Sequence, residues 1–360
     1  MSESGVTATS TVEELSRASI ARVDLSDQLG DVLALPEHLR DALWRVESAI
    51  MEDWDTAAGL VVAGMGGSAI GGALARAALG DHASRPIFVT RAYGIPTWTT
   101  PDTMVLCASY SGETEETLAC YESAGALGAK RTVVTTGGRL AEMARADGVP
   151  VIPLPGGFQP RAAVAYMIVA ALEVAALCGA GPRLTSEIDV AASHTEQLVA
   201  EWGPDAAEDS LAKELARKLL GTTPVIAGAG LTSPIAYRWK TQINENSKQP
   251  CFWNELPELD HNEIAGWEGA RDLGRFSAVF LDDSDAHPRV KERMDLTEKL
   301  IAGNAAASFR LETRGQTAIE RVISLVLLGD LVSIDLAALR GVDPGPVTLI
   351  DELKAALAAR

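Results

Sequence analysis

The amino-acid sequence predicts an α/β protein with two doubly wound parallel-sheet domains related by internal duplication, together with flanking helices. Its 360 residues exceed the ~100–200 residues that one domain usually contains. From residue 60 onward, short apolar segments alternate with stretches long enough for a helix, which is typical of parallel strands joined by helices. The same alternation begins again near residue 220.

Five segments follow one another along the chain. Residues 1–45 are polar and then amphipathic, which predicts a loose tail and a leading helix. Residues 46–185 are expected to form the first sheet domain, with strands at L-V-V-A-G-M-G, P-I-F-V-T, T-M-V-L-C-A-S-Y and R-T-V-V-T-T-G-G. A connecting helical segment (186–215), a second sheet domain (216–340) and a C-terminal helix (341–360) complete the prediction.

An internal repeat relates the two sheet domains. The segment V-V-A-G-M-G at 61–66 matches V-I-A-G-A-G at 225–230, and the same spacing separates P-I-F at 86–88 from P-C-F at 250–252. Two matches at one spacing indicate a duplication, although buried strands before glycine turns also resemble one another. The copies differ at one loop, where S-Y-S-G-E-T corresponds to a stretch containing Asp282, Asp283 and Asp285. Aspartates repel anions, so only the first copy is expected to hold one.

The charge of the chain limits its partners. It carries 31 basic and 49 acidic residues, for a formal net charge of −18. Such a surface repels nucleic acid and anionic lipid, so neither nucleic acid nor a membrane is an expected partner. An anionic small molecule stays possible where a site supplies local hydrogen-bond donors.

The cysteines and the apolar segments predict a cytoplasmic protein. Four scattered cysteines form no C-x-x-C pair, as is usual for free thiols in a reducing compartment. The first residues lack the basic and apolar parts of a signal peptide. Residues 162–181 have the length of a membrane span, but they are rich in alanine and contain Glu173, so a buried core or interface helix is expected.

A glycine-rich run, G-M-G-G-S-A-I-G-G at 64–72, follows the first strand and opens a helix. Glycine lets the backbone approach a ligand closely, and free amides at a helix N-terminus attract negative charge. The run lacks the G-K-[ST] of a nucleotide-binding loop and is a poor dinucleotide fingerprint, so no nucleotide cofactor is expected. Gly67 and Ser68 are therefore candidates for binding phosphate, with close strand–helix packing as the alternative explanation.

A second loop, S-Y-S-G-E-T-E-E-T at 109–117, follows another strand of the first domain. Ligands of open α/β sheets bind at this end of the strands. Ser109, Ser111 and Thr114 are candidates to face an anion, and Ser111 is also placed to cap the next helix. The two roles are compatible, because an oxyanion also satisfies free helix amides. The three glutamates are expected in the first helical turn, pointing to solvent.

Glu245 is a candidate general base. It lies near the end of a helix that begins around Ser233 and Pro234 and stops before Pro250. An acid at that position meets the negative end of the helix dipole, which is unfavourable for stability and useful for proton transfer. The alternative is an ordinary solvated glutamate.

His261 is one of five histidines and lies in the acidic stretch N-E-L-P-E-L-D-H-N-E. A metal site is not expected there, because the stretch offers one nitrogen ligand and no H-x-x-H spacing. A neighbouring carboxylate is expected to orient the imidazole for proton transfer.

Two cations are further candidates. Arg161 precedes the long apolar helix, where a charge is unexpected unless it points into a cleft. Lys354 lies on the amphipathic C-terminal helix. The alternative to a role in the site is an ordinary surface lysine.

Six separated motifs occur in one order from about residue 60 to the end of the chain. They are G-M-G-G-S, S-Y-S-G-E-T-E-E-T, P-R-A-A, N-E-N-S-K, N-E-L-P-E-L-D-H-N-E and I-D-E-L-K. Together they resemble the bifunctional phosphoglucose/phosphomannose isomerase family, whose members have two sugar isomerase (SIS) domains. That architecture agrees with the repeat.

This resemblance implies an aldose–ketose isomerase that interconverts glucose 6-phosphate and mannose 6-phosphate with fructose 6-phosphate. Glu245 would move the proton between C2 and C1, and Arg161 would stabilise the cis-enediolate. His261, contributed by the partner subunit of a homodimer, and Lys354 would assist ring opening. No metal and no cofactor are implied. The residues that would bind the 6-phosphate are Gly67, Ser68, Ser109, Ser111 and Thr114.

Two other functions remain as alternatives at this point. A non-catalytic phosphosugar-binding SIS regulator would need the phosphate loops without Glu245, Arg161 and His261. An isomerase of another phosphosugar would share the loops, because they contact the phosphate and not the rest of the sugar. In such enzymes, tolerance of both aldose epimers has been linked to a small hydroxyl residue near the C-terminal lysine, and Thr348 is the nearest candidate for it.

Overall fold

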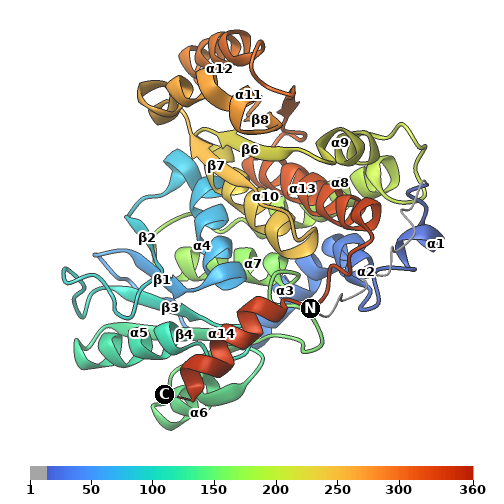
Figure 1. Ribbon diagram of the computed structural model, residues 1–360. Helices are drawn as coiled ribbons and strands as arrows, with labels where there is room; N and C mark the ends of the chain where they lie inside the picture. Colours follow the sequence, from blue (N-terminus) through green and yellow to red (C-terminus); the bar gives the residue numbers. More distant parts are fainter. Residues whose placement is uncertain (1–13, 360) are drawn as a thin grey trace.

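The structure, a computed structural model, describes residues 14–359. It contains a five-stranded and a four-stranded sheet, both parallel throughout, with a layer of helices between them (Figure 1). The first sheet has the strand order β2-β1-β3-β4-β5, in which Val62 lies between Val89 and Leu106. Its strands are β1 (Leu60–Gly64), β2 (Ile87–Thr90), β3 (Met104–Ala108), β4 (Lys130–Thr135) and β5 (Val151–Pro153).

The second sheet repeats the first four strands of this arrangement. Its order, β7-β6-β8-β9, corresponds to β2-β1-β3-β4. The predicted fold class, two parallel α/β sheets related by duplication, is therefore confirmed, and the precise limits of the domains stay a prediction. The strands are β6 (Thr223–Gly228), β7 (Phe252–Glu255), β8 (Phe276–Asp282) and β9 (Ala307–Glu312).

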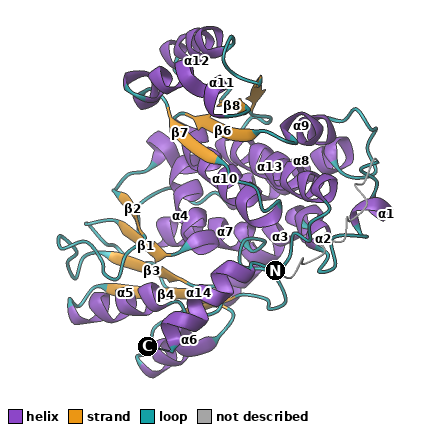
Figure 2. Ribbon diagram, in the orientation of Figure 1, coloured by secondary structure: helices purple, strands orange, loops and turns teal. Residues whose placement is uncertain are grey.

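Helices cover both faces of each sheet, which is why the inner strands β1 and β3 are apolar and buried throughout. Within β1, Leu60 and Val62 point to the central helices, whereas Val61 and Ala63 point to the outer ones. Figure 2 shows the outer helices beyond each sheet. They are α5 (Glu115–Ala126) and α6 (Gly138–Ala146) on the first sheet, and α11 (Ala270–Leu273) and α12 (Pro288–Ile301) on the second.

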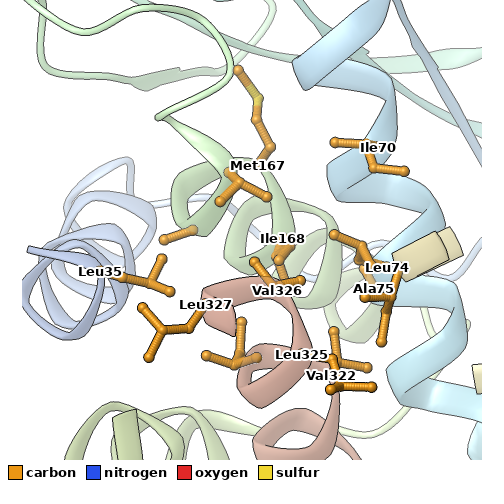
Figure 3. Close-up of a cluster of buried hydrophobic side chains, with 14 of the residues drawn as sticks. Leu35, Ile70, Leu74, Ala75, Met167, Ile168, Val322, Leu325, Val326 and Leu327 are labelled. Carbon is orange, nitrogen blue, oxygen red and sulfur yellow. The ribbon is translucent and has the colours of Figure 1, made fainter. Parts of the chain in front are cut away.

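The largest hydrophobic core lies in the helical layer between the sheets, so the two domains share it. Figure 3 shows part of this core, with Leu74, Ile168 and Val326 among its side chains. The helices of this layer are α3 (Leu35–Ser48), α4 (Gly66–Leu79), α7 (Val164–Leu177), α8 (Thr185–Trp202), α9 (Leu211–Leu219), α10 (Ser233–Asn246) and α13 (Ala318–Arg340). The remaining short elements are 3-10 turns at Gly80–His82, Gly230–Thr232, Glu258–His261 and Glu263–Gly269.

The apolar stretch at 162–181 is a core helix, as expected. It forms α7, whose one acid, Glu173, is buried and pairs with Arg183 at 3.1 Å. Within residues 14–359, one helix, α13, is long and apolar enough to cross a bilayer, whereas α7 is shorter. The most apolar stretch of α13 is entirely buried inside the protein, which is the environment of a core helix.

The leading segment is more ordered than predicted. Residues 1–13 of the expected tail lie outside the described part. The rest forms α1 (Arg17–Ile20), α2 (Gln28–Leu33) and α3, instead of one helix after a loose tail. Ser16 caps α1 by accepting from the Ser19 amide, and Asp27 caps α2 by accepting from the Gly30 amide. Short polar residues interrupt the amphipathic pattern, because they form caps instead of continuing one helix.

Gly71 allows α4 and α7 to pack closely. A Cβ atom on Gly71 would overlap the Cβ atom of Met167. We expect Gly71→Ala to lower the free energy of unfolding by about 1–3 kcal/mol, because the core cannot accept the added methyl group without shifting α7. Urea denaturation measures the change. Gly94→Ala is the matched control, since its Cβ would meet no other group within 4 Å, and equal stability of the two variants would contradict this packing.

Candidate active site

The candidate site lies at the C-terminal edge of the first sheet. Four loops meet there, after β1, β3, β4 and β5, and three of them lead directly into the helices α4, α5 and α6. Parallel strands place all of their carboxyl ends at one edge, so residues distant in sequence become neighbours.

The loop after β1 brings the N-terminus of α4 against the loop that carries Arg161. Gly66 begins α4 with φ +49°, a conformation that favours glycine. A Cβ on Gly67 would lie 2.8 Å from the Pro160 carbonyl oxygen and 3.1 Å from Arg161 Cα. The N-cap residue, Met65, contributes no side-chain hydrogen bond. The first amides of α4 are thus uncapped by a side chain and suited to an anion.

The serine loop after β3 has one buried and one exposed serine. Ser109 is 1% exposed, and its hydroxyl lies 2.9 Å from the Thr114 hydroxyl and accepts from the Gly112 amide at 3.1 Å. Ser111 is exposed, and its hydroxyl accepts from the Glu113 amide at 3.2 Å. Ser68, from the glycine loop, accepts from the amide of Tyr110 at 3.3 Å. The structure therefore brings the hydroxyls of both loops together.

Two expectations about this loop were wrong. The helix α5 begins at Glu115 with Thr114 as its N-cap, so Ser111 does not cap it and Glu113 lies before its first turn. The exposed Glu113 carboxylate accepts from the Arg139 amide at 2.8 Å, at the start of α6. The cause is a tertiary contact between two loops, which the spacing along one loop does not reveal.

The sequence analysis missed the T-T-G-G loop after β4 as part of the site. Gly112, at φ +73°, packs so closely on this loop that a Cβ would overlap the Gly137 carbonyl oxygen. Thr136 donates to the carbonyl of Tyr110 from both its amide, at 3.0 Å, and its hydroxyl, at 2.8 Å. The signal was available, because hydroxyls and glycines follow this strand as they follow β3.

Arg161 is 4% exposed and makes contacts with both domains. Its Nε donates to Asn246 Oδ1 at 2.6 Å, and its Nη2 donates to the carbonyl oxygens of Pro344 and Gly345 at 2.6 and 2.8 Å. Its own carbonyl accepts from Arg238, at 3.0 Å. Burial lowers the pKa of Arg161. The arginine precedes α7 by one short turn, as a charge aimed into the interior.

Glu245 lies in the last turn of α10, as predicted, and forms an ion pair with Arg161. The Oε2 atom of Glu245 is 3.6 Å from Nη1 of Arg161, and the glutamate side chain is 29% exposed. A carboxylate that is partly accessible and held beside a buried guanidinium is suited to proton transfer next to a developing negative charge.

Lys248 is a site residue that the sequence analysis missed. Its Nζ donates to the carbonyl oxygens of Glu245, at 2.5 Å, and of Pro344, at 3.1 Å. Partial burial of the ammonium group and the nearby Arg161 charge lower the pKa of Lys248 to about 8. The N-E-N-S-K motif contains this lysine, so its position beside Glu245 was the available signal.

The N-terminal segment closes a small cavity behind Arg161. The helix α2 contributes Gln28 and Asp31 to its wall, opposite Gln242 and Asp330. Burial and nearby aspartates raise the pKa of Asp31 to about 6. Part of the segment before residue 46 thus lines the same cavity as Arg161.

The aspartates of the second copy are bound to arginines of their own domain. Asp282 pairs with Arg310 at 2.8 Å, and Arg321 pairs with Asp283 at 2.9 Å and Asp285 at 3.5 Å. The corresponding edge of the second sheet is therefore occupied by internal ion pairs.

His261 and Lys354 do not join the site within one chain. Both are exposed, and no hydrogen bond or ion pair links either side chain to another residue of the described chain. A neighbouring carboxylate was expected to orient His261, but none binds it within the described chain. The adjacent Asp260 instead binds Arg293 at 2.9 Å and Thr297 at 2.7 Å. No three His, Cys, Asp or Glu side chains between residues 14 and 359 are grouped to hold a metal ion.

Lys354 and Thr348 lie on α14 (Thr348–Ala358), which has an exposed apolar row. Leu349, Leu353 and Leu357 are 81%, 60% and 51% exposed. This helix therefore leaves much of its apolar surface uncovered within one chain.

Known proteins resemble the chain over most of its length. A family model described as the bacterial phospho-glucose isomerase C-terminal SIS domain matches residues 208–357. A bifunctional phosphoglucose/phosphomannose isomerase from Caldicellulosiruptor bescii is 42% identical over 302 residues, which cover 83% of this chain and 89% of that protein. One from Aquifex aeolicus is 36% identical over 307 residues, covering 85% and 92%.

A solved structure shares the fold at low sequence identity. A hypothetical protein from Thermus thermophilus aligns with a TM-score of 0.72 and 17% identity, covering 97% of this chain and 95% of its own. The fold thus matches over nearly the whole chain, and the sequence is 42% and 36% identical to the two curated relatives. The chain belongs to the bifunctional phosphoglucose/phosphomannose isomerase family.

Proposed function

We propose that the protein is an aldose–ketose isomerase that interconverts glucose 6-phosphate and mannose 6-phosphate with fructose 6-phosphate. The observation that carries the proposal is the pairing of Arg161 and Glu245 beside the uncapped N-terminus of α4. One edge of the first sheet then offers an anion site, a proton-transfer group and a cation together. The names of the two curated relatives support the same reaction.

The 6-phosphate binds at the first amides of α4 and in the serine loop. Amides and hydroxyls donate hydrogen bonds without a fixed charge, which suits a product that must leave at each turnover. Ser111 faces the solvent side, where substrate enters, and the buried Ser109 holds the turn in shape. The proposed set is Gly67, Ser68, Ser109, Ser111 and Thr114.

Glu245 removes the proton from C2 or C1 of the opened sugar and returns it to the other carbon. The electron pair of the broken C–H bond moves into the cis-enediolate, and reprotonation forms the other carbonyl compound. Arg161 stabilises the negative charge on the enediolate oxygen, because a buried cation acts more strongly there than in water. In this proposal, proton transfer requires neither a metal nor a redox cofactor.

His261 and Lys354 act in ring opening, with His261 contributed by the partner subunit of a homodimer. Two observations support this part. His261 is exposed and makes no hydrogen bond within the described chain, and α14, which carries Lys354, has an uncovered apolar row. Neither nucleic acid nor a membrane is a proposed partner. A cytoplasmic location is supported by the four cysteines, which are all free and buried.

A coupled assay tests the proposed function. The purified protein is given glucose 6-phosphate and mannose 6-phosphate in turn, and fructose 6-phosphate is measured with and without a chelator. We expect turnover of both substrates and no effect of the chelator. Binding in calorimetry without turnover would indicate a phosphosugar sensor, activity only on pentose or amino-sugar phosphates would indicate another isomerase, and loss of activity with chelator would contradict the metal-free mechanism.

A further inference from the structure

Tyr110 lies between the two serines of the phosphate loop but faces the protein interior. Its ring is 8% exposed and belongs to the central hydrophobic core. A buried tyrosine usually requires partners for its hydroxyl. The position of these partners shows which part of the site the ring reaches.

The hydroxyl of Tyr110 binds both sides of the loop between β5 and α7. It donates to the carbonyl oxygen of Pro155 at 3.1 Å and accepts from the amide of Phe158 at 2.9 Å. This loop leads to Arg161. Burial raises the pKa of Tyr110, so the hydroxyl stays protonated and keeps its donor. On the other side of the loop, the ring of His38 lies 4.8 Å from the ring of Phe158.

The backbone of Tyr110 binds the two other loops of the site. Its amide donates to the Ser68 hydroxyl at 3.3 Å, and its carbonyl accepts from the Thr136 amide and hydroxyl. One residue of the β3 loop is therefore hydrogen bonded to each of the loops after β1, β4 and β5.

We infer that Tyr110 is a positioning residue that fixes the spacing between the phosphate-binding loop and the loop that carries Arg161. The inference rests on the proposed function, in which one hexose 6-phosphate must span both loops. The phosphate and the enediolate lie at opposite ends of the same sugar, so a change in loop spacing moves the reacting carbons away from Glu245 and Arg161. Misplacement of reacting groups lowers kcat more than it weakens binding.

The contacts of Arg161 limit how much kcat should fall when the Tyr110 hydroxyl is removed. Its side chain keeps its bonds to Asn246, Pro344 and Gly345 when the tyrosine hydroxyl is lost. What changes is the position of the loop relative to Ser109 and Ser111. We therefore expect Tyr110→Phe to lower kcat about 10-fold while KM for fructose 6-phosphate changes less than about 2-fold.

The test compares two inhibitors of the full-length protein, one that occupies a single loop of the site and one that spans both. Inorganic phosphate occupies the phosphate loop alone, whereas 5-phosphoarabinonate carries a carboxylate in place of the enediolate and spans both loops. We expect Tyr110→Phe to leave inhibition by phosphate unchanged and to weaken inhibition by 5-phosphoarabinonate about 10-fold, because an analogue of the transition state senses the same spacing. A general structural defect would weaken both inhibitors.

Tyr121→Phe is the matched control. Tyr121 is a fully buried tyrosine of the same domain whose hydroxyl binds Asp147 at 2.9 Å, away from the loops. The Tyr121→Phe variant should lose about as much stability as Tyr110→Phe, while its kcat and KM stay unchanged. Unchanged kcat in Tyr110→Phe, or equal weakening of the two inhibitors, would overturn the inference, whereas inactivity of the wild-type protein would overturn the proposed function instead. If Tyr110→Phe does not fold, Thr136→Val takes its place, because it removes one hydrogen bond to the Tyr110 carbonyl. This variant must then weaken inhibition by 5-phosphoarabinonate while inhibition by phosphate stays unchanged.

Discussion

Replacement of Glu245 by glutamine should lower kcat by ~10²–10⁴-fold, the usual contribution of a general acid–base group. Glutamine has nearly the same shape as glutamate but cannot accept a proton at neutral pH. The side chain is partly accessible beside Arg161, so the fold should not depend on its charge. Steady-state kinetics with fructose 6-phosphate measure the loss, and calorimetry with the same ligand should show retained binding.

Glu37→Gln is the control for the loss of one acidic charge. Glu37 is an exposed residue of α3, and its side chain has no hydrogen bond or ion pair to another described residue. The control should keep wild-type activity. Turnover of Glu245→Gln at the wild-type rate would show that another group transfers the proton.

Replacement of Asp335 by asparagine should raise the free energy of unfolding at pH 7 by about 4 kcal/mol. Asp335 lies on α13 and is 4% exposed, and its carboxylate has no hydrogen bond or ion pair within residues 14–359. Burial raises its pKa from 3.8 to about 8. The folded protein must therefore keep the acid protonated at neutral pH, which costs free energy relative to the unfolded chain. Asparagine is neutral at every pH and removes this cost.

The pH dependence follows from the sign of this shift. Between pH ~4 and ~8 the folded state binds the Asp335 proton and the unfolded state does not, so the contribution of this residue to stability falls as pH rises. The gain from Asp335→Asn should therefore be largest at pH 8 and nearly absent at pH 4. Urea denaturation of both proteins at pH 4, 6 and 8 measures it.

Asp81→Asn serves as the control for Asp335→Asn. Asp81 is exposed in a surface turn, so its replacement should change stability little at any of these pH values. A gain in Asp335→Asn that is the same at pH 4 and pH 8 would show that the carboxyl is not protonated by burial.

The sheets were predictable because their sequence signals are local. The strands β1 and β3 are continuous apolar runs before glycine or hydroxyl residues, and the duplicated runs at 61–66 and 225–230 become β1 and β6. The meeting of the loops after β1 and β3 was also predictable, since the strand ends of a parallel sheet share one edge. Their role in binding phosphate stays a prediction. Arg161 and Glu245 were recognisable because one is a charge just before a long apolar helix and the other is an acid near the C-terminal end of a helix.

The contacts that complete the site were not predictable, because they join distant parts of the chain. Arg161 binds Asn246, 85 positions later, and Pro344, 183 positions later. The wrong expectation for Glu113 has the same origin, because the Arg139 amide that it binds belongs to the next strand–helix unit. The roles of His261 and Lys354 stay predictions, since both side chains are exposed and neither makes a hydrogen bond or ion pair with the rest of the described chain.

Incubation with fructose 6-phosphate in D₂O tests the central claim most directly. A proton held by the partly accessible Glu245 exchanges in part with solvent before it is returned. Some deuterium should therefore appear at C2 of the glucose 6-phosphate and mannose 6-phosphate formed by the wild-type protein, and Glu245→Gln should incorporate almost none. Mass spectrometry and NMR of the products measure both. Aldose formation without solvent deuterium, or equal incorporation by the two proteins, would contradict proton transfer by Glu245.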